Sequence, residues 1–162
     1  MNDDLTKLVE EAIRLELNVS ELYLLFYRIF PEDSEFWWKL AIEEQNHAAL
    51  LKTLLLMSRS ELQIPREILP TGLGDLIQSN NKIDEALIKF SSHPDRIKAF
   101  QFAFEVENSA GEMHYESFMK LGAESKLTSV FRKLNGEDIN HAERIKQYMI
   151  DHQIPVVDSA NA

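Results

Sequence analysis

The chain has 162 residues, 44% of them hydrophobic and 27% charged, a composition typical of one globular domain and not of a disordered segment. Its formal net charge is −10, so the phosphates of nucleic acid or of an anionic membrane would be repelled, and neither is expected as a partner. The sequence contains no cysteine, which excludes disulfides, thiolate catalysis, iron–sulfur clusters and cysteine-bound zinc.

The N-terminal residues are acidic, and no apolar run follows them, so they do not resemble a signal peptide. No stretch approaches the roughly 18 apolar residues that a membrane helix needs. The protein is therefore expected in the cytoplasm. We predict one domain over residues 1–152 and a flexible tail over residues 153–162.

Two helices are predicted in the N-terminal third of the chain. Apolar residues recur at helical spacing over residues 4–29, and a second apolar stripe continues to about residue 57. Pro31 ends the first helix, and Asp33 or Ser34 is expected to cap the second. Because the connection is short, the two helices are expected to be antiparallel neighbours.

Residues 59–92 have a different character, because prolines and glycines interrupt any regular pattern between residues 65 and 74. The pattern predicts a long crossover that contains one short helix at residues 83–90. Ser92 is expected to cap a third helix that ends near residue 121 and carries Ile97 on its inward stripe. A fourth helix is predicted over residues 124–151. The predicted fold is all-α: a helix pair, a long crossover and a second helix pair.

The two helix pairs carry the same motif. Glu44-x-x-His47 in the second helix matches Asp138-x-x-His141 in the fourth, and Glu16 in the first matches Glu107 in the third. One acid-x-x-His match is expected by chance in so acidic a chain. These matches, however, all lie on the apolar stripes, where an unpaired acid would be very costly.

Two divalent cations would balance the four inward acids. The spacing of the motif places an acid and an imidazole on one helical face, within reach of one ion. Oxygen and imidazole donors without sulfur suit iron, manganese or zinc, and a carboxylate-rich helical site favours iron or manganese. The sequence therefore predicts a two-metal site whose ligands are Glu16, Glu44, His47, Glu107, Asp138 and His141.

This arrangement resembles the ferritin-like superfamily, and within it the rubrerythrin-type di-iron proteins. The stretch LELNVSELY (15–23) resembles the family's first-helix signature, and LAIEEQNHAALL (40–51) its second. The resemblance covers most of residues 4–150. It implies a ferritin-like four-helix bundle around two iron ions, with manganese or a mixed pair as alternatives and zinc as a purification substitute. The implied chemistry is reduction of hydrogen peroxide or dioxygen.

The chain departs from this family in two respects. Asp138 stands where the family has glutamate, and it is one methylene shorter. A cysteine-ligated rubredoxin domain is also missing, so the resemblance implies electrons from an external donor protein. No catalytic residue is predicted beyond the ligands themselves.

Other residues near the predicted ligands have simpler interpretations. Tyr23, His114 and Tyr148 are candidates for contacts around the metal ligands, although ordinary core packing would also explain them. Glu43 precedes a ligand and is expected to face solvent. The aromatic residues at 36–38 are expected in the core or at the surface of a possible homodimer.

Three other functions are compatible with the same sequence features. Iron oxidation coupled to storage or delivery would need a cage or a receiving partner. An oxygenase would use the segment 59–92 to shape a pocket for an organic substrate. A metal-free helical bundle would use the polar core residues for packing alone.

Overall fold

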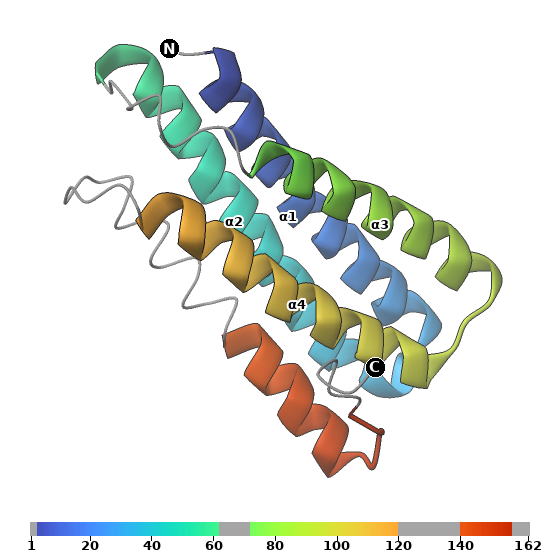
Figure 1. Ribbon diagram of the computed structural model, residues 1–162. Coiled ribbons are helices and arrows are strands. Elements are labelled where there is room, and N and C mark those ends of the chain that lie inside the picture. The colour runs from blue at the N-terminus through green and yellow to red at the C-terminus, as the bar shows by residue number, and fades with distance from the viewer. Residues whose placement is uncertain (1–2, 62–71, 120–139, 157–162) are drawn as a thin grey trace.

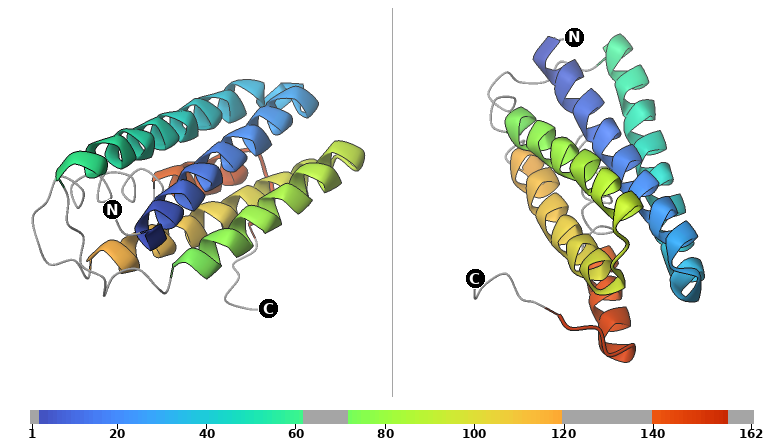
Figure 2. Two further views of the ribbon diagram at one scale, coloured as in Figure 1. Left: turned by 90° about the horizontal axis from the view of Figure 1, so that it is seen from above. Right: turned by 90° about the vertical axis from the view of Figure 1, so that its right-hand side faces the viewer.

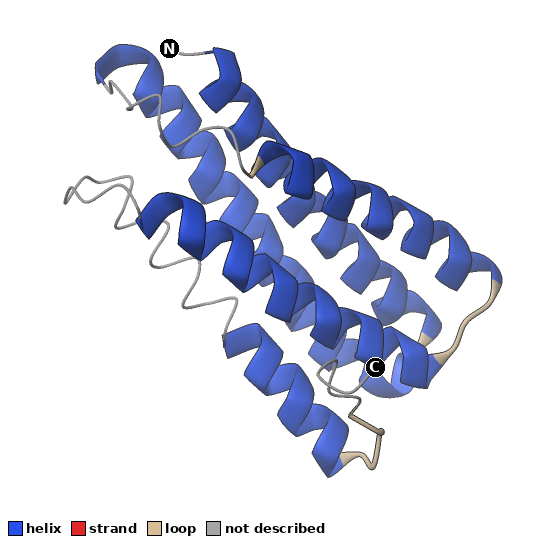
Figure 3. Ribbon diagram, in the orientation of Figure 1, coloured by secondary structure: helices blue, strands red, loops and turns tan. Residues whose placement is uncertain are grey.

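The computed structural model describes residues 3–61, 72–119 and 140–156, and every regular element in these ranges is a helix (Figure 3). The elements are α1 (Asp3–Ile29), the 3₁₀ turn η1 (Pro31–Asp33), α2 (Ser34–Glu61), α3 (Leu73–Ser92), α4 (Arg96–Met119) and a further helix at residues 140–151. This confirms the all-α prediction. Among the described residues, no helix has both the length and the apolar character that crossing a membrane requires.

The first two helices form an antiparallel pair, as predicted (Figure 1). Val9, Ile13 and Tyr23 face the interior, since residues three or four apart share one side of a helix. α1 ends at Ile29 ahead of Pro31, which has no N–H to continue a helical ladder. The chain reverses within η1 and enters α2 at Ser34.

An aromatic core joins this pair to α4. Trp37 on α2 is fully buried. Its ring centroid lies 5.5 Å from that of Tyr23, 5.0 Å from that of Phe26 and 4.4 Å from that of Phe100. Burial of rings this large is the main source of stability in such a core. It fixes three helices around the polar side chains described below.

The crossover contains a much longer helix than predicted. α3 begins at Leu73, so the expected short helix at residues 83–90 is wrong in extent. α3 packs against α1 (Figure 2). At this contact the fully buried Asn80 donates to the backbone oxygen of Glu11 at 3.1 Å and accepts from Asn18 at 3.0 Å. These hydrogen bonds satisfy a polar group that would otherwise destabilise the contact.

The start of α4 also differs from the sequence prediction. Ser92 is the last residue of α3 and not an N-cap. Instead, the carboxylate of Asp95 accepts a hydrogen bond from the backbone N–H of Lys98 at 3.1 Å, which is the capping geometry. Ile97, which we expected on the inward stripe, is 45% exposed.

Asp33 is buried in an ion pair and is not the helix cap that the sequence suggested. Arg96 holds it with two hydrogen bonds, from Nε to Oδ2 at 2.7 Å and from Nη2 to Oδ1 at 2.8 Å. The hydroxyl of Tyr148 donates to the same Oδ1 at 2.9 Å. This cluster joins η1, α4 and the helix at 140–151 at one end of the molecule.

The last described helix closes with a left-handed residue. Gln153 has φ 56°, and the N–H of Ile154 donates to the carbonyl of Met149 at 2.8 Å. This is the Schellman pattern, which commonly brings an apolar residue back onto the helix. Ile154 is accordingly buried, although the sequence placed it in the tail. Most of the predicted fourth helix, residues 124–139, lies outside the described residues.

Candidate metal centre

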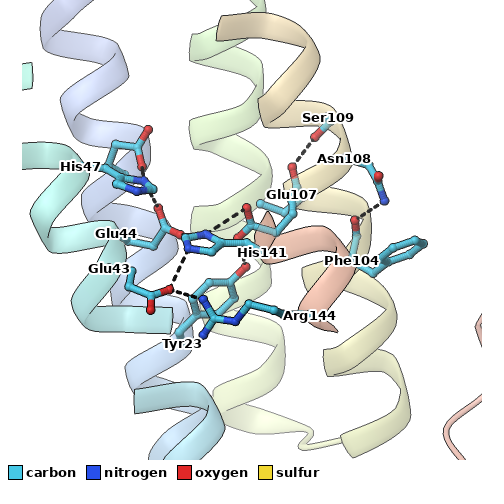
Figure 4. Close-up of polar contacts among 12 residues, drawn as sticks. Tyr23, Glu43, Glu44, His47, Phe104, Glu107, Asn108, Ser109, His141 and Arg144 are labelled. Carbon is cyan, nitrogen blue, oxygen red and sulfur yellow. Dashed lines mark hydrogen bonds and ion pairs between the residues drawn. The ribbon is translucent and has the colours of Figure 1, made fainter. Parts of the chain in front are cut away.

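Five of the six predicted ligands converge between the helices. Glu16 comes from α1, Glu44 and His47 from α2, Glu107 from α4, and His141 from the helix at 140–151. Figure 4 shows the last four of these side chains pointing toward one another. Each is only 2–3% exposed. They point inward because each lies on the same helical face as the apolar residues one turn away. Asp138, the sixth predicted ligand, lies outside the described residues.

The first group of donors lies between α1 and α2. Nδ1 of His47 lies 3.4 Å from Oε2 of Glu16 and 3.3 Å from Oε2 of Glu44. The donor atoms of these three residues all lie within 4.8 Å of one another. A single cation could therefore contact all three.

The second group contains Glu44 again, together with Glu107 and His141. Nδ1 of His141 lies 2.8 Å from Oε1 of Glu44 and 3.7 Å from Oε2 of Glu107. The carboxylate of Glu44 thus presents one oxygen to each imidazole. The two imidazole rings stack with centroids 5.4 Å apart and an angle of 12°.

Two of the possible metal-binding atoms in this second group are buried without a hydrogen bond. Oε1 of Glu44 and Nδ1 of His141 are 2.8 Å apart, yet within the described part of the chain neither atom makes a hydrogen bond of acceptable geometry. Buried polar atoms are nearly always satisfied. A carboxylate oxygen and an imidazole nitrogen that lie close together without a hydrogen bond are expected where both would bind the same cation. The residues present therefore fit a metal ion.

When no cation is bound, the neighbouring carboxylates make the two imidazoles bind protons more tightly than free histidine does. Burial lowers the pKa of His47, but contacts with Glu16 and Glu44 outweigh this and raise it to about 12. Burial likewise lowers the pKa of His141, and contacts with Glu107 and Glu44 raise it to about 10. Protonated imidazoles then compensate part of the buried negative charge. A metal ion binding at Nδ1 would displace these protons.

The three candidates around the ligands have different positions in the structure. The hydroxyl of Tyr23 donates to Oε1 of Glu107, so this tyrosine contacts a candidate ligand. Tyr148 lies instead in the Asp33 cluster, where burial and the hydrogen bond to Asp33 raise its pKa to about 12. The side chain of His114 lies outside the described residues.

Sequence reasoning missed two residues beside the candidate centre. Glu43, which we expected to face solvent, places Oε2 2.8 Å from Nε2 of His141. Nη1 of Arg144 lies 2.6 Å from the same oxygen. The only signal in the sequence was a doubled acid, Glu43–Glu44, opposite a His-x-x-Arg pair. That signal has meaning only once the two helices are known to be adjacent.

Comparison of the chain with protein-family models, with curated proteins and with solved structures found no match. The proposed function is therefore supported by the sequence pattern and by the geometry of the described residues. A separate cavity of about 420 Å³ lies between α3 and α4 and is lined by residues such as Lys89, Phe90 and Phe102. None of the candidate ligands lines it.

Proposed function

We propose that this protein is a non-haem di-iron oxidoreductase of the rubrerythrin type, with a ferritin-like arrangement of four helices around two metal ions. It would reduce hydrogen peroxide or dioxygen with electrons from an external donor protein. Iron bound by carboxylates and imidazoles supplies the redox chemistry that amino acid side chains lack.

The position of Glu44 is the observation that carries this proposal. One of its oxygens faces His47 and the other faces His141, so two donor groups share one carboxylate. Glu16 completes the first group, and Glu107 completes the second. Glu44 would help to hold both ions, and each imidazole would help to hold one of them. Asp138 is proposed as the sixth ligand by its place in the sequence repeat.

The residues of this chain have three further tasks in such a reaction. The buried walls keep bulk water from the ligands, which strengthens every charge interaction at the site. Tyr23 holds Glu107 in position through its hydroxyl. The acids also limit how much positive charge accumulates, since carboxylates neutralise bound cations.

A structural role without metal is the main alternative. It is disfavoured because three buried acids face only two imidazoles, which leaves negative charge in the interior that packing alone does not require. The oxygenase alternative has no support from the described cavity, because the ligands do not line it.

Metal analysis of protein purified without chelator tests the proposal. About two metal ions per chain are expected, as in other proteins whose facing helices supply carboxylates and imidazoles. The double variant Glu16→Ala, His141→Ala should lose them. A matched control is Glu21→Ala, His152→Ala, which changes the same residue types at exposed positions. Wild-type protein with no more metal than the first double variant would overturn the proposal.

The oxidant is tested by mixing the ferrous protein with hydrogen peroxide or with dioxygen. Rapid oxidation by peroxide, followed in the near-ultraviolet, supports the peroxidase reaction. Fast oxidation by dioxygen with slow oxidation by peroxide would instead favour the iron-oxidation alternative.

A further inference from the structure

Both ring nitrogens of His141 are contacted by α2, from two successive residues. Nδ1 faces Oε1 of Glu44 at 2.8 Å, and Nε2 faces Oε2 of Glu43 at 2.8 Å (Figure 4). The ring itself is 2% exposed, whereas the side chain of Glu43 is 39% exposed. The imidazole therefore lies between a buried carboxylate and one that reaches the surface.

Arg144 fixes the outer carboxylate. It lies three residues after His141, on the same face of the helix, and its Nη1 is 2.6 Å from the oxygen of Glu43 that also meets Nε2. A half-exposed glutamate would otherwise sample many rotamers in solvent. Arg144 and His141 both belong to the helix at 140–151, and both contact the same oxygen of Glu43.

We propose that Glu43, held in place by Arg144, is a positioning residue that accepts the Nε2–H of His141 and thereby makes Nδ1 the metal-binding atom. The inference rests on the proposed function. An imidazole has two tautomers, and the hydrogen bond at one nitrogen decides which nitrogen offers a lone pair. Glu43 selects the tautomer with hydrogen on Nε2, which leaves Nδ1 to face Glu44 and Glu107.

The arrangement also explains why an acid is useful at a position that sequence reasoning assigned to solvent. A carboxylate that accepts the outer N–H makes the imidazole a more basic ligand and fixes the plane of its ring. Arg144 adds a direct link between α2 and the helix at 140–151, so the ring orientation and the helix contact depend on the same oxygen atom.

Zinc binding to the full chain tests this inference, since Zn²⁺ has no redox chemistry and binds the same donor types. Glu43→Leu should weaken one of the two zinc sites about 10- to 100-fold, as loss of such an outer contact typically does. Glu43→Gln keeps an oxygen acceptor and should weaken it less. Arg144→Met should also weaken it less than Glu43→Leu does. The matched control is Glu35→Leu on the same helix, whose carboxylate pairs with Lys39 at 2.6 Å.

Ring ¹⁵N NMR of the zinc-loaded protein provides a readout that a merely structural role would not change. Wild type should show His141 with hydrogen on Nε2 and zinc on Nδ1, with the signal assigned by its loss in His141→Gln. In Glu43→Leu this pattern should be lost or mixed with the opposite tautomer. Circular dichroism melting of each variant checks that it folds.

The outcomes distinguish failure of the proposed function from failure of the positioning role. If wild type binds no zinc and no iron, the proposed function itself fails. If wild type binds two zinc ions but Glu43→Leu matches Glu35→Leu in affinity and keeps the wild-type tautomer, only the positioning role fails. Zinc found on Nε2 of His141 in wild type would also overturn it.

Discussion

Two clusters of buried charged side chains lie in the part of the chain that the structure describes, and their charges are compensated in different ways. In the cluster around Asp33, one acid meets one guanidinium and one hydroxyl, and three hydrogen bonds of 2.7–2.9 Å account for both carboxylate oxygens. In the central cluster, three acids meet two imidazoles, and Oε1 of Glu44 and Nδ1 of His141 make no hydrogen bond within the described residues.

The difference teaches how a structural ion pair and a ligand site can be told apart. Burying charge is costly in both clusters, so each needs compensation. The Asp33 cluster supplies that compensation from its own residues. The central cluster has excess negative charge and unsatisfied donor atoms, which are the properties that attract a cation.

The largest expected effect is loss of both metal ions from Glu44→Gln. Because Glu44 belongs to both donor groups, this single change should weaken metal binding in each group by more than about 100-fold. Loss of a side chain that only hydrogen-bonds a metal ligand typically costs about 10- to 100-fold, and loss of a ligand should cost more. Asp33→Asn, the equivalent change in the other cluster, should leave metal content unchanged. Zinc titration with direct metal analysis measures both. One tightly bound ion remaining in Glu44→Gln would show that the carboxylate is not shared.

The next effect is on the stability of the metal-free protein as a function of pH. The folded state holds the His141 proton with a pKa of about 10 and the His47 proton with a pKa of about 12, against 6.5 for free histidine. The folded state therefore binds these protons more tightly than the unfolded chain. Their stabilisation is fully present below about pH 6.5 and is lost as the pH rises through the two folded pKa values.

Between about pH 6.5 and 10, the free energy of unfolding of the metal-free protein should fall as the pH rises, because only the folded chain retains the two imidazole protons there. Urea unfolding in the presence of a chelator measures this slope. The double variant His47→Gln, His141→Gln should flatten it. Added zinc should stabilise more strongly at higher pH, because it competes with those protons. Stability that rises with pH across this window in metal-free protein would contradict the prediction.

The smallest of these effects concerns the Asp33 cluster alone. Asp33→Asn weakens the contact with Arg96, which is 28% exposed and keeps Glu32 at 3.6 Å, and should destabilise the fold by about 1.5 kcal/mol. Asp33→Leu combined with Arg96→Met removes both charges and should recover much of that loss. Thermal unfolding of the three proteins gives the comparison. Equal losses in the single and the double variant would indicate that packing and not charge dominates there.

The sequence was sufficient to predict most of the central cluster. Glu16, Glu44, His47, Glu107 and His141 interrupt apolar stripes at helical spacing, and the structure brings these five residues together. Periodicity reveals such positions because it reports directly which side of a helix is buried. Their role as metal ligands stays a prediction.

Features that depend on contacts between helices could not be read from the pattern. Glu43 looks solvent-facing because it is offset from the inward stripe, and only the neighbouring helix brings His141 and Arg144 to it. Asp33 has the sequence signature of a cap, but Arg96 takes its carboxylate. At the start of α3, Gly74 suggested a break, whereas a single exposed glycine costs a helix only about 1 kcal/mol.

The tight reversal at η1 has a consequence for the order of folding. Glu16, Glu44 and His47 belong to two helices joined by a very short connection, so bringing them together closes only a small loop of chain. Glu107 and His141 belong to segments far along the chain, and their approach requires slower, non-local docking. We expect the N-terminal hairpin to organise its three donors first, as an early nucleus onto which the rest of the molecule condenses.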